Sequence, residues 1–499
     1  MMNRFAGCVS IMALLSGLLA SGCTVLGPDF AAPEAATPAG FVLGEAASGR
    51  SVAVAEKVDP KWWRLFNDPV LTRLEERMVD GNLDIRTAAI RLVQARAQLG
   101  FVMAAGLPTM GTSGSASEAM TSARGPFMLA SRSTSQPAGA SQFHATPNSR
   151  LFQTHEVYQA GFDAGWEIDF WGRVQRVVES STAQLEATEE ARREIQVTAS
   201  AELARAYVLL RGTQRKAAIT RENLEIARRS LALTRDRAAG GVTTDLDVAN
   251  AAATVETIAA QLPALEQRQS ELANMIGLLL GAQPRALEAE LAAPRALPPP
   301  PPRVPVGLPS DLARRRPDIR QAEAMLHAAT ANIGVATADF YPRVSLTGSV
   351  GQQSLNLHQL LDSRAFFFSV GPSISMPIFD GGRVQRTVEL REAQQQEAAV
   401  LWQRTVLGAL HEVDNALTAF DAEQRRRDRL LAADKETRRA LALAAARYQQ
   451  GVTDFLQVLV AQRNLLAVEQ DLSDSLTAIS GNMVQLYKAL GGGWEQTAP

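Results

Sequence analysis

The sequence Gly172-Arg173-Val174-Gln175-Arg176 recurs unchanged at residues 382–386, an offset of 210 positions. Further matches occur at the same offset and without a gap: residues 241–243 with 451–453, and residues 280–281 with 490–491. The segment 172–281 therefore repeats in register. Such self-similarity indicates that one supersecondary unit has been duplicated.

Upstream of this repeat, the two halves match at a larger offset. Asp84-Ile85-Arg86 corresponds to residues 318–320, and Pro108 corresponds to Pro342, which is an offset of 234. The difference between 234 and 210 indicates an insertion of 24 residues in the first half. Residues 111–150 are rich in Ser, Gly, Ala and Thr and show no periodicity, so we predict a long polar loop there.

Each half contains one long run without proline, at residues 172–239 and 382–450. We expect each run to form a single helix, roughly 100 Å long at 1.5 Å per residue. A shorter helix follows each long helix after a glycine turn, and it covers only part of that length. The helical stretches 68–105 and 311–340 can cover the rest. One long helix is thus expected to pair with two shorter helices stacked end to end.

Polar and apolar residues alternate with a period of two in residues 342–352, 368–376 and 158–169. This period predicts strands, and a fourth strand is expected somewhere in residues 108–120. A hairpin alone is marginal in water, and four short strands cannot close a barrel. An open sheet edge cannot lie in lipid. The predicted hairpins therefore need further strands or a partner, and the alternative to a sheet in a membrane is a soluble two-sided sheet.

The irregular segments 24–67 and 282–316 and the tail from residue 491 are expected to meet where the short helices meet, as a belt. Hydrophobic residues make up 46% of the chain and aromatic residues only 6%, which favours long helices over a large sheet. The formal net charge of −2 provides no basic field for binding nucleic acid.

The first 22 residues have the features of an export signal, with an apolar run from Ile11 to Ala20. Ser21-Gly22-Cys23 then resembles a bacterial lipobox, which predicts acylation of the Cys23 thiol and a membrane anchor. The alternative is an ordinary cleaved signal followed by an incidental cysteine. Cys8 lies within the signal, so the mature chain would keep one thiol and form no internal disulfide.

No catalytic or metal-binding pattern is convincing. The five histidines are scattered, and none has a Cys, carboxylate or second His at a ligand spacing that repeats. Gly491-Gly492-Gly493 ends a helix instead of starting one, so it does not resemble a phosphate-binding loop. We therefore expect no enzymatic activity, no cofactor and no metal.

Four motifs carry a family resemblance. They are Leu308-Pro309-Ser310-Asp311-Leu312, Arg315-Arg316-Pro317-Asp318-Ile319, Phe340-Tyr341-Pro342 and Tyr487-Lys488-Ala489-Leu490-Gly491-Gly492-Gly493-Trp494. With them, the chain resembles the TolC-like outer-membrane factor family, in particular its lipoprotein (NodT-type) branch of efflux channels.

The resemblance implies a mixed, mainly α, internally duplicated protomer that forms a homotrimer. Three copies would combine their strands into a 12-stranded transmembrane β-barrel and their helices into a 12-helix tunnel through the periplasm. The implied partners are a periplasmic adaptor protein, an inner-membrane transporter of the proton-driven resistance type and outer-membrane lipid. The implied function is passive exit of small molecules such as drugs from a tripartite efflux system.

The signal sequence, the internal repeat and the irregular segments together give the expected organisation of the chain. The expected segments are a signal peptide (1–22), a lipid-anchored N-terminal segment (23–67), a first structural repeat (68–281), a proline-rich linker (282–316), a second structural repeat (317–490) and a tail (491–499).

A passive duct needs a gate, which we expect at the two glycine turns. Arg447 and Tyr448 precede the second turn, and Asp245 and Asp247 follow the first. Arginine or tyrosine paired with carboxylate between neighbouring protomers could hold the tip closed. The resemblance assigns Tyr448 and Asp247 to such a closing network. The alternative is that the aspartates only cap the helix that follows them.

The second turn departs from the family pattern, because Gln457 and Val460 stand where aspartates are usual. Either Asp454 replaces the acidic ring, or Leu456 and Val460 form an apolar constriction. Arg463 completes the candidate gate. The candidate contacts for the adaptor are the residues that protrude at the turns, namely Gly241, Val242, Thr243, Gly451, Val452 and Thr453.

Two other functions remain open from the sequence. The same architecture could serve as the outer-membrane duct of a type I polypeptide secretion system. A periplasmic coiled-coil scaffold lipoprotein that does not span the membrane is a different class, and it predicts sustained heptads without hairpins.

Overall fold

The structure is a computed structural model that describes residues 25–35, 37–41, 49–120 and 154–494. The chain divides into two compact units. Of the described residues, the first comprises 25–30, 98–120, 154–182 and 328–395, and the second comprises the others. The long helices contribute to both units, so each unit draws on both sequence repeats.

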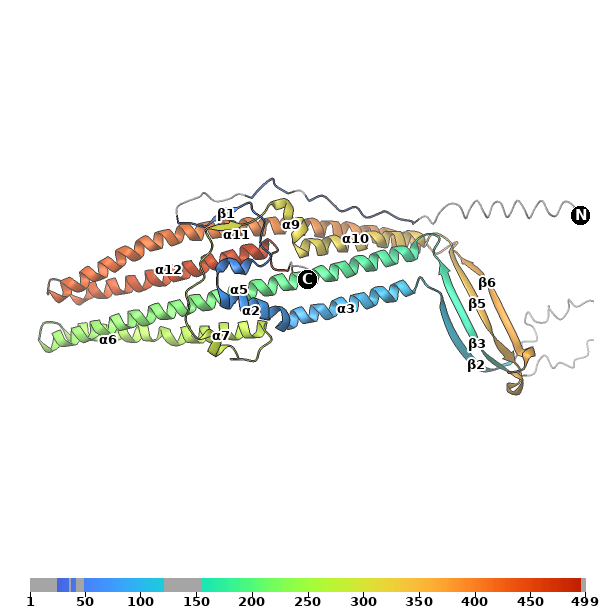
Figure 1. The fold of residues 1–499 in the computed structure, drawn as a ribbon, viewed down its shortest axis with the longest axis horizontal. Coiled ribbons are helices and arrows are strands. Elements are labelled where there is room, and N and C mark those ends of the chain that lie inside the picture. Colours follow the sequence, from blue (N-terminus) through green and yellow to red (C-terminus); the bar gives the residue numbers. More distant parts are fainter. Residues whose placement is uncertain (1–24, 36, 42–48, 121–153, 495–499) are drawn as a thin grey trace, which may run out of the picture. The chain divides into compact units, whose positions relative to one another are not determined.

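The first unit contains a four-stranded antiparallel sheet in the order β2-β3-β5-β6 (Figure 1). Its strands are β2 (Thr109–Met120), β3 (Thr154–Ile168), β5 (Arg343–Ser354) and β6 (Phe366–Ser375). The three strands predicted from alternation are confirmed, with shifts of a few residues at their ends. Each hairpin comes from one repeat, and β3 pairs with β5 to join the two hairpins.

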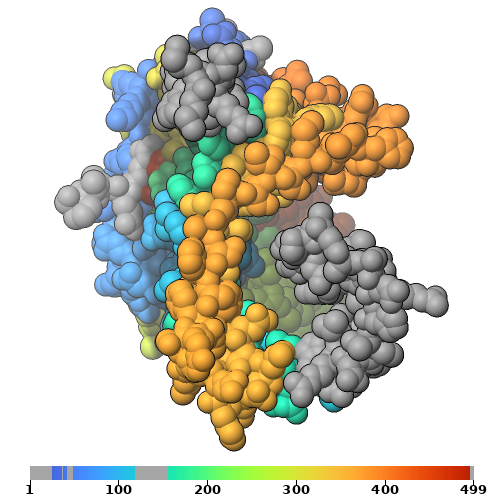
Figure 2. Space-filling model, turned by 90° about the vertical axis from the view of Figure 1, so that its right-hand side faces the viewer, coloured from blue at the N-terminus to red at the C-terminus, as the bar shows by residue number. Residues whose placement is uncertain are grey.

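The sheet has two chemically different faces. Phe162, Val350 and Phe368 pair across three strands, so their side chains lie on one face, where 56%, 41% and 71% of each is exposed. The atoms of β5 and β6 appear in orange in the space-filling view of Figure 2. The neighbouring row on the opposite face is short and polar: Asp163, Ser349 and Ser369. An exposed aromatic face opposite a face of small polar residues is the pattern of a sheet between lipid and water.

The prediction of a polar loop over residues 111–150 is wrong for its first ten residues. These residues belong to β2, which pairs with β3 from Thr109 to Met120. Their alternation is hidden because small residues occupy both faces: Thr112 and Gly114 alternate with Ser113 and Ser115. The fourth strand expected within residues 108–120 is confirmed. The rest of the predicted loop lies outside the described residues.

Two helices of 67 residues each, α5 (Arg173–Ala239) and α11 (Arg383–Gln449), begin within the repeated pentapeptide and confirm the two long helices. The other helices are α2 (Pro69–Gly81), α3 (Leu83–Ala104), α6 (Asp245–Ala259), α7 (Gln261–Leu279), α8 (Glu288–Leu291), α9 (Pro309–Arg315), α10 (Pro317–Ala338) and α12 (Phe455–Ala489). Short 3₁₀ turns are η1 (Trp62–Phe66), η3 (Leu357–Gln359) and η4 (Ser363–Ala365). Within the described ranges, no helix combines the length and apolar character that crossing a membrane requires.

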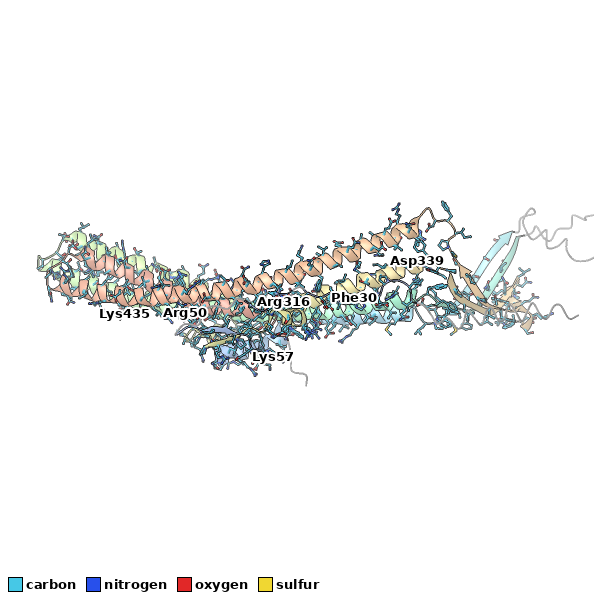
Figure 3. All side chains as sticks on the ribbon, turned by 90° about the horizontal axis from the view of Figure 1, so that it is seen from above. Phe30, Arg50, Lys57, Arg316, Asp339 and Lys435 are labelled. Atoms are coloured by element: carbon cyan, nitrogen blue, oxygen red, sulfur yellow. The ribbon has the colours of Figure 1, made fainter. Side chains whose placement is uncertain are left out.

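Equivalent residues interrupt the helical stretch that precedes the strands in each repeat. The sequence predicts one helix over residues 68–105, but Asn82 separates α2 from α3. Its side-chain oxygen caps α3 by accepting from Ile85 N (3.0 Å), and its side-chain nitrogen donates to Leu279 O at the end of α7 (2.9 Å). In the second repeat, Arg316, labelled in Figure 3, separates α9 from α10. It donates to Ala489 O at the end of α12 (2.7 Å). Asn82 and Arg316 are 234 positions apart, and Leu279 and Ala489 are 210 positions apart, which are the two offsets of the internal repeat. Each break is thus a joint where a short helix meets the next one.

The first returning helix is also divided, since α6 ends and α7 begins on either side of Ala260. The second returning helix, α12, is continuous.

The core of the second unit lies where the irregular segments meet. Trp62 is fully buried and stacks on Tyr487 with ring centroids 5.4 Å apart. Gly492 packs against Trp62 so closely that an added Cβ would lie 3.1 Å from its ring. Strand β1 (Val52–Val54) pairs in parallel with β4 (Arg303–Pro305). The N-terminal segment, the linker and the C-terminal tail therefore all contribute to this region, which we call the belt.

Candidate functional site

The two helix turns of the second unit have the same backbone geometry. Gly241 has a φ of +67° and Gly451 a φ of +77°, values that favour glycine. Val242 N donates to Arg237 O (2.9 Å), and Val452 N donates to Arg447 O (3.0 Å). This pattern satisfies carbonyl groups at the ends of α5 and α11. The backbone conformation itself thus favours glycine at both turns, independently of any partner that the turns contact.

Asp247 acts as a helix cap within its own protomer. Its Oδ2 accepts hydrogen bonds from Thr243 Oγ1 (2.6 Å) and Thr244 N (3.2 Å), and Thr244 Oγ1 accepts from Asp247 N (3.3 Å). This is a capping box at the start of α6. The hydrogen bond from Thr243 holds the pKa of the Asp247 carboxyl below its usual value. The contacts of Asp247 are therefore those of a helix cap, which is the alternative to a gate residue. Asp245, in the same first turn of α6, is exposed.

Tyr448 is buried, with only 3% of it exposed, and its ring packs against Phe455 at 5.5 Å. The guanidinium of Arg237 lies 4.6 Å above the Tyr448 ring, and its Nη1 donates to Tyr448 O (2.8 Å). Arg237 comes from α5 and Tyr448 from α11. One cation therefore links the two helix turns of the protomer.

Arg237 was not among the residues predicted for the gate. It stands 210 positions before Arg447, so the internal repeat could have identified it. Arg447 itself is exposed, whereas its neighbour Tyr448 is buried. No hydrogen bond joins Tyr448 to Asp247 in the described protomer, and the Tyr448 hydroxyl is buried without a hydrogen-bond partner there.

An exposed apolar strip covers the tip. Val242, Leu246, Val452, Leu456 and Val460 are between 46% and 69% exposed. Leu456 and Val460, proposed for an apolar constriction, are thus free to meet other chains. The remaining predicted residues lie at or near the surface: Asp454, Arg463, Thr243 and Thr453.

The base of the sheet in the first unit carries aromatic residues and the start of the described chain. Trp171 packs against Tyr341 at 4.9 Å, and Leu26 N donates to Trp171 O (3.1 Å). Arg176 is buried and donates to Leu26 O (3.0 Å) and Asp29 Oδ1 (2.7 Å). The segment that follows the predicted signal is therefore bound specifically at the base of the sheet.

Gly27 makes this docking possible. It has a φ of +88°, and an added Cβ would lie 2.4 Å from Gly334 Cα. Any side chain at Gly27 would push the segment away from α10. Cys23, the predicted lipidation site, lies outside the described residues.

Long duplicated helices joined by glycine turns and a sheet with one apolar and one polar face are features of the class of outer-membrane channel proteins. The family model for "outer membrane efflux protein" matches residues 76–282 and 308–492. The chain is 34% identical to the solvent efflux pump outer membrane protein SrpC of Pseudomonas putida, with 96% of this chain and 97% of that protein covered. It is 30% identical to nodulation protein T of Rhizobium leguminosarum bv. trifolii, over 96% and 97% of the two chains.

Solved structures agree. The outer-membrane channel OprN is similar with a TM-score of 0.83 and 36% identity, covering 94% of this chain and 99% of that one. The outer membrane protein VceC of Vibrio cholerae gives a TM-score of 0.76 and 26% identity, covering 88% and 100%. The chain belongs to the outer membrane efflux protein family, which confirms the resemblance found from its motifs.

Proposed function

We propose that this chain is one protomer of a trimeric, passive exit duct that carries small molecules across the outer membrane as part of a tripartite efflux system. The observation that carries the proposal is the two-faced sheet. Phe162, Val350 and Phe368 offer a lipid-compatible face, while the row of Asp163, Ser349 and Ser369 suits a water-filled lumen. Relatives named as solvent and toluene efflux proteins support a small-molecule cargo.

The two edges of the sheet support the proposed trimer. Strands β2 and β6 have no further strand beside them in the described protomer. Unpaired backbone groups are costly in lipid, so both edges need partners. Joining β2 of one protomer to β6 of the next gives a closed 12-stranded barrel from three copies. The same symmetry places the helices in a common tube.

The gate is proposed at the tip. Arg237 holds the two turns of one protomer together through the Tyr448 ring and carbonyl, and the carboxylate of Asp247 is engaged as a cap. Opening would require the α11–α12 pair to move relative to α5 and α6, which breaks the contact between Arg237 and Tyr448. The exposed strip, including Val242 and Val452, would then provide the surface for a periplasmic adaptor, behind which an inner-membrane transporter supplies the cargo.

A lipid anchor at Cys23 fits the docking of the following segment. Leu26 and Gly27 are fixed beside Trp171 and Tyr341, and aromatic residues gather at membrane interfaces in barrels of this type. An acyl chain on Cys23 would thus start close to the interface that these aromatic rings mark. Mass spectrometry of the mature N-terminus tests this, because a free, unmodified N-terminal residue excludes the anchor.

Planar-bilayer recording tests the duct and its gate together. The purified trimer should give small single-channel steps, and Arg237→Ala should raise their conductance because the cation that links the two turns is lost. Arg235→Ala is the matched control, since Arg235 is exposed on the same helix two residues away. Equal conductance of both variants and the wild type would exclude Arg237 from the gate, and the absence of any steps would exclude the duct.

A further inference from the structure

The belt contains a pocket with an unusual charge. Its volume is about 460 Å³, and its lining includes Arg50, Arg215 and Arg427 but no acidic side chain. Ligand sites in proteins typically have volumes of about 300–1,000 Å³. The whole chain has a net charge of −2, so three arginines around one pocket are a local concentration against the overall balance.

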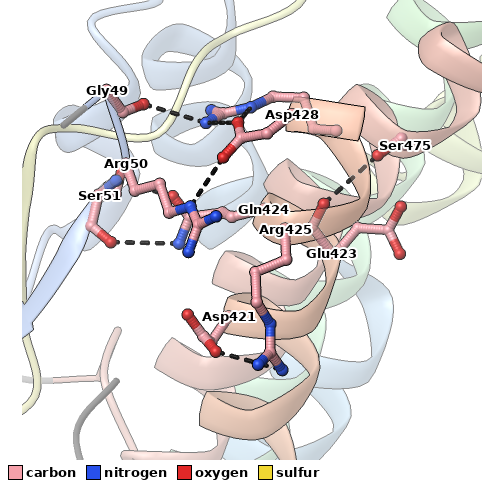
Figure 4. Close-up of polar contacts among 10 residues, drawn as sticks. Gly49, Arg50, Ser51, Asp421, Glu423, Gln424, Arg425, Asp428 and Ser475 are labelled. Atoms are coloured by element: carbon pink, nitrogen blue, oxygen red, sulfur yellow. Dashed lines mark hydrogen bonds and ion pairs between the residues drawn. The ribbon is translucent and has the colours of Figure 1, made fainter. Parts of the chain in front are cut away.

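Two of these arginines are held in place by one carboxylate. Asp428 accepts from Arg50 Nε (2.8 Å) and from Arg427 Nη2 (2.7 Å), as Figure 4 shows for Arg50. Their side chains are only 22% and 16% exposed. Arg427 also donates to Gly49 O (3.0 Å). One carboxylate thus positions two guanidinium groups and leaves an excess of positive charge once Arg215 is counted.

Arg215 differs from these two. It is exposed on α5 and makes no hydrogen bond or ion pair with any described residue. An arginine with no partner at the mouth of a pocket can reorient toward an anion without breaking a native contact. Guanidinium groups bind carboxylate and phosphate with paired N–H donors.

The apolar part of the pocket lining comes from the linker and α12. It consists of proline residues of the linker together with Leu297, Leu476 and Ile479. Ser480 Oγ donates to Pro298 O (2.8 Å), which attaches the linker to α12. Gln424 exchanges hydrogen bonds with the backbone of Ser51 (2.7 and 3.1 Å; Figure 4), which attaches the other rim to α11. Both rims are therefore preformed.

We propose that this pocket binds small amphiphilic organic anions, with a carboxylate or phosphate group at Arg50, Arg215 and Arg427 and an apolar body against Leu297, Leu476 and Ile479. Such binding goes beyond passage through the duct, because the pocket is lined by belt segments together with residues of α5, α11 and α12. Ligand binding there would tie residues 49–51 to the linker and stiffen the belt.

The test uses the full-length protein in detergent and ¹⁹F NMR line broadening. The probes are 4-fluorobenzoate and 4-fluorophenyl phosphate, which distinguish carboxylate from phosphate, and the neutral 4-fluorobenzyl alcohol, which reports partitioning into the micelle. At least one anion should bind saturably and more weakly at high salt, and the alcohol should not. Arg215→Gln should weaken binding about tenfold, since one charge-assisted contact is lost.

Arg229→Gln is the matched control, because Arg229 is exposed on the same helix and does not line the pocket. It should bind the anions as the wild type does. Arg215 supports no native contact, so its variant should keep the trimer, as electrophoresis without heating would verify. Binding of the alcohol equal to that of both anions, or unchanged anion binding in Arg215→Gln, would overturn the proposal.

Discussion

Replacing Phe368 with arginine should prevent assembly in the membrane, whereas replacing Ser369 with arginine should not. The two residues are adjacent in β6 and point to opposite faces of the sheet. Phe368 pairs with Val350 on the apolar face, and Ser369 pairs with Ser349 on the polar face. An arginine facing lipid near the bilayer midplane costs about 2–4 kcal/mol in a barrel, so three copies in a trimer cost roughly 6–12 kcal/mol.

The assay is the fraction of protein recovered in the outer membrane as a trimer that resists dissociation without heating. Phe368→Arg should lose most of this fraction. Ser369→Arg should keep it and change only the conductance, because its charge faces water. Equal assembly of the two variants would refute the assignment of the faces.

Three further predictions concern the belt and the docked N-terminus. Glu75 is fully buried, and burial raises the pKa of its carboxyl well above 4.5, although Ser200 opposes the shift in part. The contribution of this carboxyl to the free energy of unfolding is therefore fully present below its pKa in the unfolded chain and is lost as the pH rises through its pKa in the folded protein. Glu75→Gln should therefore be more stable than the wild type at pH 8. It should also show a smaller fall in melting temperature between pH 5 and pH 8. Arg316→Ala should lower the free energy of unfolding by about 2–3 kcal/mol in denaturant titrations, because the side chain that bonds Asp318, Glu412 and Ala489 O is lost. The control Arg314→Ala should change the free energy of unfolding little, since Arg314 is exposed. Gly27→Leu should displace the N-terminal segment from Gly334, detected as faster proteolysis within residues 25–35, and unchanged proteolysis would contradict the docking.

The duplication made most of the fold predictable. Because Gly172 and Gly382 open equivalent segments, the two long helices and their glycine turns could be placed from sequence within a residue or two. Period-two alternation also located β3, β5 and β6, since their two faces differ strongly in polarity. These are local signals that the packing of the chain does not override.

The features that sequence missed depend on contacts between distant residues. Asn82 follows Gly81 and caps α3 through Ile85 N, a local signal that the expectation of one continuous helix did not use, and its side chain also donates to Leu279 O at the end of α7. Strand β2 lacks contrast between its faces and is defined by its pairing with β3. Strand β2 is thus defined by a distant partner, whereas the break at Asn82 combines a local cap with a contact to the distant Leu279.

The candidate site was predicted only in outline. The glycine turns and Tyr448 were located, but the partner of Tyr448 in the protomer is Arg237, and Asp247 is engaged with Thr243 and Thr244. The aspartate and the tyrosine stand at positions that a family pattern pairs. Short local capping bonds compete with that pairing, which sequence spacing alone does not weigh.

Single-channel recording of the purified wild-type protein in planar bilayers is the most direct test of the duct. The account predicts discrete conductance steps from trimers, which become larger when Arg237 is replaced by alanine. A folded trimer that produces no steps in the wild type or in the variant would contradict it.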